Sequence, residues 1–164
     1  MRDSSNGFTE SNRQAEARRV ALTDSKPRIV VYELPGEWTL LVGATDVDND
    51  YLSTTLVERD DWWFHADGAP GSHVILRSKP GERPGRETLR QAAAVAAYHS
   101  KARTAGTVRV YCTRGRYVRK PHGAETGTVE VSKGTVMKVR PDKNFAIRLS
   151  PKAKLEAPQR VNHN

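Results

Sequence analysis

The chain has 164 residues, a length that suits one domain, and its formal net charge is +8. A basic excess of this size favours a polyanionic partner, either nucleic acid or an anionic membrane surface. The sequence contains no run of about 18 apolar residues, so we expect no membrane-spanning helix. A single cysteine excludes an internal disulfide, and the first residues lack an apolar signal segment, which predicts a cytoplasmic protein.

Composition divides the chain into three parts. Residues 1–26 and 151–164 are polar and of mixed charge, with too few large apolar side chains to offset the entropy lost on ordering. We therefore expect a flexible tail at each end and an ordered domain at residues 27–150.

Strand signals come first within this domain. β-branched and aromatic residues predict strands at 28–34 and 38–43, and the Pro35-Gly36 turn between them indicates an antiparallel hairpin. Residues 46–50 form an acidic turn, after which the apolar spacing over 51–56 favours a short helix. Strands are also predicted at 62–65 and 74–76, on either side of a loop in which Gly68 and Gly71 supply positive φ.

The clearest helix signal lies at residues 88–103. Thr88 and Gln91 have the spacing of a capping box. Residues 89–103 contain six alanines and neither glycine nor proline, and alanine has the highest helix propensity. Small side chains also let a helix lie close to a sheet, so we expect one long alanine-rich helix packed against the strands.

The hydrophobic period changes to two after residue 107. Predicted strands lie at 108–113 and 116–120 with a turn at Arg114-Gly115, at 128–132 and 135–140 with a turn at Lys133-Gly134, and at 144–149 along an edge. Strands, a main helix and further strands with hairpin connections predict an α+β fold with a mainly antiparallel sheet.

Residues 61–77 contain two of the three tryptophans and two of the five histidines, around a Pro-Gly turn. The two halves of this segment, Asp-Trp-Trp-Phe-His at 61–65 and Pro-Gly-Ser-His-Val at 70–74, resemble the hallmark of the NFACT-R domain. Further stretches that resemble this domain lie at 49–52, at 91–93, 96–98 and 100–102, at 119–121 with Gly123, Ala124 and Gly127, and at 136–141. The resemblance therefore runs in order through about residues 27–150.

The resemblance implies an RNA-binding role and not an enzymatic one. In RqcH-like proteins this domain accompanies an NFACT-N domain, a helix-hairpin-helix segment and a coiled coil. Those proteins act in ribosome-associated quality control and recruit tRNA to extend stalled nascent chains. This chain is too short to contain the other three parts, so we expect a free-standing domain. Its expected partners are tRNA or ribosomal RNA, together with the large ribosomal subunit.

The residues themselves point to RNA through a basic run. Residues 101–124 contain seven lysines or arginines and no acid. On strands of period two, Arg109 shares a face with Tyr111, and Tyr117 shares one with Arg119. Such a face can neutralise phosphates and stack unpaired bases. The alternative is an ordinary solvated face on which the tyrosines pack against arginine stems.

Two groups of candidate site residues follow. The candidate RNA contacts are His65, His73, Arg77, Lys101, Arg103, Arg109, Tyr111, Arg116, Tyr117, Arg119 and Lys120. The candidate signature-loop residues are Trp63, Asp67, Pro70, Gly71 and Ser72.

The histidines leave several interpretations open. His65 and His73 either contact phosphate or ribose, or bond to backbone groups and fix the loop between them. With His99 they could form a metal site, but there is no matching cysteine pair and no HExxH motif, so we expect neither metal nor cofactor. A second functional hypothesis is a small RNA- or nucleotide-processing enzyme that uses the His65/His73 loop.

Two further residue types are interpreted from strand alternation. Trp62 and Trp63 point to opposite faces, so one belongs to the core and the other can act as a stacking platform. Cys112 alternates with Val108 and Val110, which predicts a buried and unreactive thiol.

Overall fold

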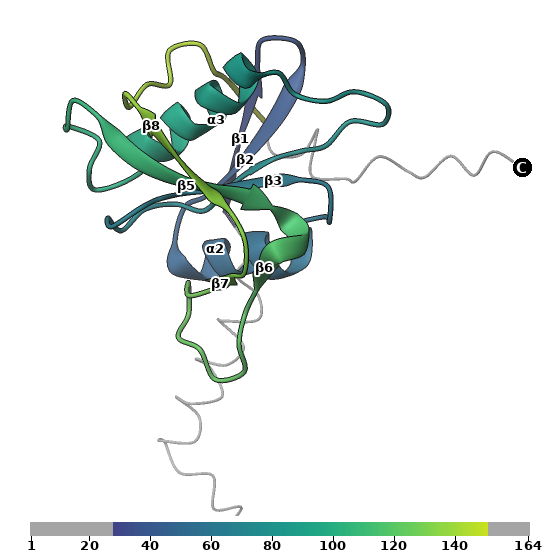
Figure 1. Cartoon of the computed structure of the whole chain (residues 1–164), viewed down its shortest axis with the longest axis vertical. Coiled ribbons are helices and arrows are strands. Elements are labelled where there is room, and N and C mark those ends of the chain that lie inside the picture. The colour runs from purple at the N-terminus through teal and green to yellow at the C-terminus, as the bar shows by residue number, and fades with distance from the viewer. Residues whose placement is uncertain (1–27, 151–164) are drawn as a thin grey trace, which may run out of the picture.

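The computed structural model describes residues 28–150, so the predicted tails at 1–26 and 151–164 lie outside the described residues. Seven strands form one sheet in the order β8-β5-β3-β4-β2-β1-β9 (Figure 1), and every neighbouring pair is antiparallel. The strands are β1 Ile29–Leu34, β2 Trp38–Gly43, β3 Trp62–Ala66, β4 Val74–Leu76, β5 Val108–Arg114, β8 Thr135–Val139 and β9 Ile147–Leu149. The α+β class predicted from the sequence is confirmed.

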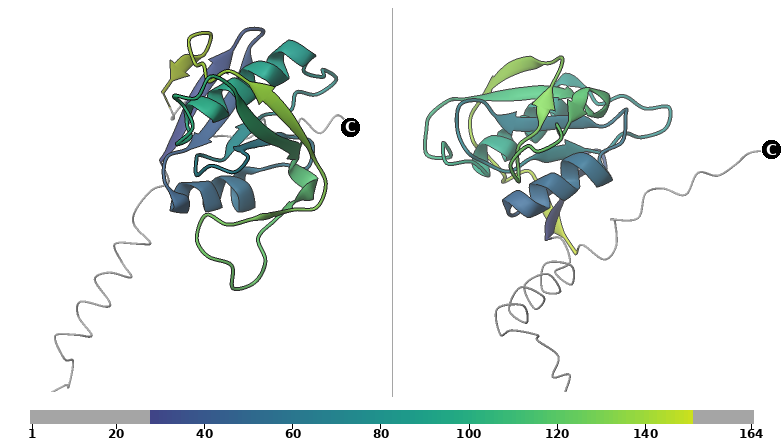
Figure 2. Two further views of the ribbon diagram at one scale, coloured as in Figure 1. Left: turned by 60° about the vertical axis from the view of Figure 1, so that its left-hand side comes forward. Right: turned by 90° about the horizontal axis from the view of Figure 1, so that it is seen from below.

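Helices cover both faces of this sheet (Figures 1 and 2). Helix α3 (Arg86–Tyr98) packs on one face, against β3, β5 and β8. Helix α2 (Asp46–Tyr51) runs into the π-helical turn η1 (Leu52–Leu56), and this unit lies on the other face. No helix between residues 28 and 150 has the length and apolar character that a bilayer crossing needs.

Strand alternation assigns side chains to these two faces. Along β3, Phe64 and Ala66 join the core cluster under α3, whereas Trp63 joins a second cluster with Leu52 of η1. Successive residues of a strand point to opposite faces, so His65, two residues after Trp63, lies on the second face. The sheet is therefore buried on both sides, and the second face contains the signature histidines.

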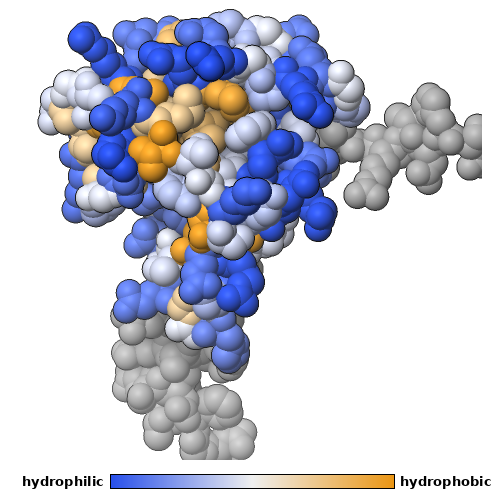
Figure 3. All heavy atoms as spheres, viewed as in Figure 1, coloured by the Kyte–Doolittle hydropathy of each residue, from blue (hydrophilic) through white to orange (hydrophobic). Residues whose placement is uncertain are grey.

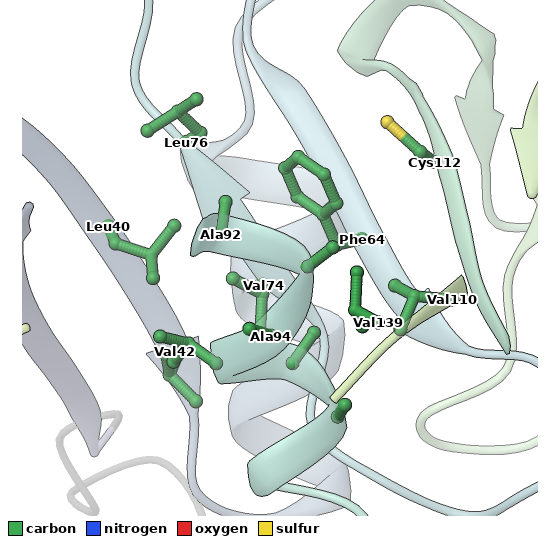
Figure 4. Packing of buried hydrophobic residues seen from close by; sticks show 14 of the residues in the cluster. Leu40, Val42, Phe64, Val74, Leu76, Ala92, Ala94, Val110, Cys112 and Val139 are labelled. Carbon is green, nitrogen blue, oxygen red and sulfur yellow. The ribbon is translucent and has the colours of Figure 1, made fainter. Parts of the chain in front are cut away.

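The core under α3 depends on small side chains. Ala92 to Ala97 are buried, five of these six residues being alanine. Figure 4 shows Ala92 and Ala94 among side chains of the sheet, with Phe64 nearby. Cys112 is buried in the same cluster, and burial raises the pKa of its thiol to about 12. The thiol is therefore protonated at neutral pH.

The observed helix α3 differs from the prediction at both ends. It begins at Arg86 with Gly85 as N-cap and has no side-chain cap, so Thr88 lies inside the helix and the predicted capping box is wrong. It ends at Tyr98 instead of residue 103. After Tyr98, backbone hydrogen bonds to the loop of residues 67–72 replace the bonds that a further helical turn would make.

The short helix on the second face begins earlier than predicted. Thr45 caps α2, since its hydroxyl oxygen accepts a hydrogen bond from the Asp48 backbone N–H. The predicted acidic turn is therefore the first turn of the helix itself, where acidic side chains suit the helix dipole.

Two predicted features after β5 are also wrong. Residues 115–117 form a 3-10 turn, η2 (Gly115–Tyr117), and only Val118–Arg119 (β6) is extended. Strand β7 (Glu130–Val131) pairs with β6 as a second small sheet, whereas β8 pairs with β5, so no hairpin forms at Lys133-Gly134. A side chain at residue 134 would lie 2.7 Å from the Cys112 carbonyl oxygen. Glycine thus lets the chain pass close to β5 before β8 begins.

Close helix packing leads to a stability prediction. Ala93 and Ala96 are fully buried, so leucine at either position must displace neighbouring side chains. We expect Ala93→Leu and Ala96→Leu each to cost about 1–3 kcal/mol. The control Arg90→Ala changes an exposed side chain and should cost less than about 0.5 kcal/mol. Chemical denaturation measures all three, and equal small effects would mean that α3 is not closely packed.

Candidate nucleic-acid interface

The signature loop, residues 67–72, joins β3 to β4 and is tied to the rest of the domain at both ends. The Asp67 N–H donates to the Arg109 carbonyl of β5 over 2.8 Å. At the other end the Ser72 N–H donates to His99 O over 3.0 Å, and the Lys101 N–H donates to Pro70 O over 2.9 Å. The loop therefore has a fixed position relative to both β5 and the end of α3.

Glycine is needed in this loop for two different reasons. Gly68 has φ of +76°, which favours glycine as predicted. Gly71 does not have positive φ, so that part of the expectation is wrong. A Cβ at residue 71 would lie 2.8 Å from Ser100 Cβ and 2.9 Å from Ser100 Cα. Gly71 is therefore required by the close approach of two backbones.

His73 is a buried hydrogen-bond partner. The residue is only 4% exposed, and its Nδ1 lies 2.7 Å from Ser53 Oγ. The same Ser53 oxygen accepts a hydrogen bond from Trp63 Nε1 over 2.9 Å. The His73 backbone N–H donates to Asn49 Oδ1 over 3.0 Å. Of the two interpretations left open, fixing the loop is the one that this burial fits.

His65 lies beside this buried group but is partly open to solvent. Its ring stacks on Trp63 at a centroid distance of 6.0 Å and meets the edge of His73 at 5.3 Å. Burial lowers the pKa of His65. Burial, and then repulsion from His65, lowers the pKa of His73 to about 4. His73 is therefore neutral at pH 7, and the lowered pKa of His65 favours its neutral form as well.

The three histidines do not share one site. His99 contacts Tyr32 and Tyr98, with Tyr32 Oη 2.9 Å from His99 Nε2. Within residues 28–150, no group of three or more His, Cys, Asp or Glu side chains is placed to hold a metal ion.

The two tryptophans divide as the alternation predicts. Trp63 is buried in the second cluster. Trp62 is partly exposed on the other face, and the guanidinium carbon of Arg114 lies 4.5 Å from its ring centroid. Arginine thus already covers the tryptophan that could have served as a stacking platform.

Arg77, a candidate RNA contact, has a structural partner. Its Nη1 donates to Asp61 Oδ2 over 2.8 Å and to the Leu56 carbonyl, and the side chain is 14% exposed. Asp61 is fully buried and also accepts the backbone N–H groups of Glu58 and Ser78. This ion pair joins the end of η1 to β3 and β4, so Arg77 has little freedom to leave it.

Most of the basic run is also occupied. Four of its cations form ion pairs: Arg109 with Asp67, Arg116 with Asp60, Arg119 with Glu130, and Lys120 with Asp50. Arg109 and Tyr111 do share a face of β5, but Tyr117 lies in the η2 turn, so the predicted alternation with Arg119 fails there.

Four of the cations that lie outside the ion pairs of residues 28–150 are near His99. We define the His99 cluster as Lys101, Arg103, Lys143 and Arg148, and none of the ion pairs within residues 28–150 involves these four. Burial lowers the pKa of His99, and the positive charges of Lys143, Arg148 and Arg103 lower it further. The electrostatic field at this ring is therefore positive.

Two of these cations were not predicted. Lys143 Nζ lies 4.8 Å from the centroid of the Tyr98 ring. Arg148 lies directly opposite Tyr32 in the β1–β9 pair, and Tyr32 contacts His99. Only the pairing of the last strand with the first places Arg148 there, and no local sequence signal predicts that pairing.

The signature loop separates two pockets. The aromatic pocket, about 520 Å³, is lined by Trp63, His65, residues 66–70, Tyr111, Val129 and Val131. The basic pocket, about 620 Å³, is lined by Ala44, Thr45, Asp46, Asn49, residues 70–72, Tyr98, His99, Ser100, Lys101 and Arg103. Pro70 lines both, so the loop is their common wall.

The face of the molecule that Figure 3 shows is mainly hydrophilic. On the face seen in Figure 3, a few apolar side chains gather where β5 and β8 cross, and hydrophilic side chains surround them. Val136 of β8 is 38% exposed.

The fold of this chain is also found in a solved structure. This is the C-terminal part of the fibronectin/fibrinogen-binding protein from Streptococcus suis, with TM-score 0.68 and 30% identity, over 74% of this chain and 48% of that one. Residues 29–137 match the family described as the NFACT protein RNA binding domain. The chain belongs to this family, as its resemblance implied.

Curated relatives of the chain carry the name Rqc2 homolog RqcH. The protein of Bacillus subtilis is 40% identical over 123 residues, which are 75% of this chain and 21% of the relative. That of Streptococcus suis is 34% identical over 106 residues, or 65% of this chain and 19% of the relative. The chain thus spans about a fifth of the length of the relatives it matches.

The lowered pKa of His73 predicts acid sensitivity. Because the folded pKa is about 4 and the unfolded value is about 6.5, the unfolded chain binds the proton first as pH falls. The contribution of His73 to the free energy of unfolding is present above pH 6.5. It is lost progressively as the pH falls to about 4, and the loss amounts to at most about 3 kcal/mol. Urea denaturation from pH 7 to 4.5 measures this loss.

A pair of variants isolates the His73 contribution. His73→Gln should be less stable at pH 7, because it disturbs the bond to Ser53, but its stability should fall less steeply with acid. His122→Gln changes an exposed histidine and should keep the steep dependence. An unchanged pH slope in His73→Gln would contradict the assignment.

The buried Asp61–Arg77 ion pair predicts a large mutational cost. Asp61→Ala leaves the Arg77 guanidinium and two backbone N–H groups without their acceptor, so we expect a loss of about 3–5 kcal/mol. The matched control Asp60→Ala breaks an exposed pair with Arg116 and should cost less than about 1 kcal/mol. Equal unfolding midpoints for the two variants would show that Arg77 is not held by Asp61.

Proposed function

We propose that this chain is an RNA-binding module for tRNA or ribosomal RNA that acts in ribosome-associated quality control in the cytoplasm, with the large ribosomal subunit as a partner. Family membership supports RNA as the ligand, and the RqcH relatives support the process. The observation that carries the proposal is the His99 cluster. None of its four cations has an ion-pair partner in residues 28–150, and two of them, Lys101 and Arg103, line the basic pocket beside the signature loop.

Unpaired cations suit phosphate better than paired ones. A cation that is already bound to a carboxylate must lose that partner, or share it, before it can neutralise a phosphate. Lys101 and Arg103 are exposed, so they can bind without that cost. The ion-paired part of the basic run, from Arg109 to Lys120, is therefore secondary in this proposal.

The proposed role is binding and not catalysis. The nearest arrangement to a nucleophile and base is Ser53 with His73, but Ser53 is 2% exposed and its oxygen already accepts from Trp63. A substrate cannot reach this hydroxyl without opening the fold. The domain is accordingly proposed to need no cofactor and to present a preformed surface.

A salt titration of RNA binding tests the proposal. If the four cations neutralise about four phosphates, log affinity should fall with log salt at a slope of about −3. Lys101→Glu with Arg103→Glu should weaken binding and flatten the slope by at least about 1. Arg116→Glu with Arg119→Glu changes the net charge equally and is the matched control, with a smaller effect expected.

The outcomes separate site binding from general attraction. Equal losses in the two double variants would mean that net charge alone, and not the His99 cluster, determines affinity. A flat salt response would contradict phosphate binding altogether. Purified tRNA should bind more tightly than a DNA duplex of equal length, and equal affinity would contradict selectivity for RNA.

A further inference from the structure

The aromatic pocket offers ring surfaces at one end of the sheet. His65 of β3 and Tyr111 of β5 are direct partners in the strand register, so their side chains point to the same face and lie next to each other. The ring of Trp63, two residues before His65, stacks on the His65 ring. Tyr111 and His65 are both partly exposed, which leaves ring surface available to a ligand.

Backbone geometry keeps the Tyr111 ring in place. A Cβ at residue 134 would lie 2.7 Å from Tyr111 Cε1, so glycine at this position gives the ring its space. Val129 and Val131 line the pocket across from the signature loop. The pocket is therefore a shallow, open depression with aromatic and aliphatic walls and a volume of about 520 Å³, which gives room for one base to lie against the rings.

The charges around the pocket favour a base over a phosphate. Asp67 lines the pocket, and its carboxylate would repel a phosphate that entered. The Asp67 charge is partly balanced by Arg109 Nε at 3.4 Å. The neutral imidazole of His65 adds no positive charge that could hold a phosphate inside. A flat, uncharged ring meets none of these obstacles and can stack on the exposed ring surfaces of Tyr111 and His65.

The neighbouring pocket is more basic, since its two cations outnumber its one acidic side chain, Asp46. Lys101 and Arg103 line the basic pocket on the far side of the signature loop, and Pro70 belongs to both walls. An RNA strand that crosses the loop can therefore present a base on one side and a phosphate on the other.

We infer that the aromatic pocket binds one unpaired RNA base, stacked against Tyr111 and His65, while the adjoining backbone meets the His99 cluster across the signature loop. This inference rests on the proposed RNA binding and specifies which part of an RNA the domain recognises. The faces of paired bases are already stacked on their neighbours inside a helix and are not available to these rings, so the preferred RNA has an unpaired nucleotide beside its phosphate contacts.

Two RNA probes test the inference: a blunt hairpin, and the same hairpin with a single-stranded 3′ extension. The wild-type chain should bind the extended hairpin more tightly. Tyr111→Ala should weaken binding of the extended hairpin about tenfold, or about 1.4 kcal/mol, and leave the blunt hairpin unchanged. Tyr111→Phe keeps the ring and should bind like the wild type. Tyr117→Ala, a tyrosine outside the pocket, is the matched control.

A spectroscopic measurement avoids the need for any variant to fold. An extension that carries 2-aminopurine should lose fluorescence on binding to the wild-type chain, because the base stacks in the pocket. Unchanged fluorescence at saturation, or equal affinity for the blunt and extended hairpins, would overturn the base pocket while leaving RNA binding intact. Failure of both hairpins to bind would instead overturn the proposed function.

Discussion

The close contact between Gly71 and Ser100 is the constraint on which the rest of the site depends. Two backbone hydrogen bonds flank it, from Ser72 to His99 and from Lys101 to Pro70, and a side chain at residue 71 would collide with Ser100. The contact ends helix α3 and turns the following lysine and arginine toward the loop. It therefore sets the distance between an aromatic wall built on β3 and β5 and a basic wall built after α3. Neither wall alone would define a site.

A buried polar network supports this loop from below. Trp63 Nε1 donates to Ser53, which contacts His73, while Asn49 accepts the His73 backbone N–H. These bonds join α2 and η1 to both strands that border the loop. Each of the buried groups named here has a partner, and a satisfied network of this kind favours one arrangement of its elements. The signature histidines thus have different roles: His73 fixes the scaffold, and His65 stands at the edge of the pocket.

Local signals account for what could be predicted. Alternation and turn residues were sufficient for β1, β2, β3 and β4, because each signal lies within a few residues. They failed where the partner is distant in sequence: β7 pairs with β6, β8 returns to β5, and β9 carries Arg148 back to Tyr32. The exposure of Arg77 was also unpredictable, since its environment depends on a carboxylate that becomes fully buried only in the folded sheet.

The distribution of charge shows why a count of basic residues is a poor guide to an interface. The run from 101 to 124 contains no acid, yet folding brings Asp50, Asp60, Asp67 and Glu130 to its arginines and lysines from other segments. Lys101 and Arg103 of this run keep no ion pair within the described residues, and Lys143 and Arg148 join them near His99. A nucleic acid is attracted by net charge at long range, but at contact it needs groups that are not already bound. The fold therefore places unpaired cations on one side of a rigid loop and aromatic ring surface on the other. This arrangement suits an RNA strand that leaves a double helix better than it suits the double helix itself.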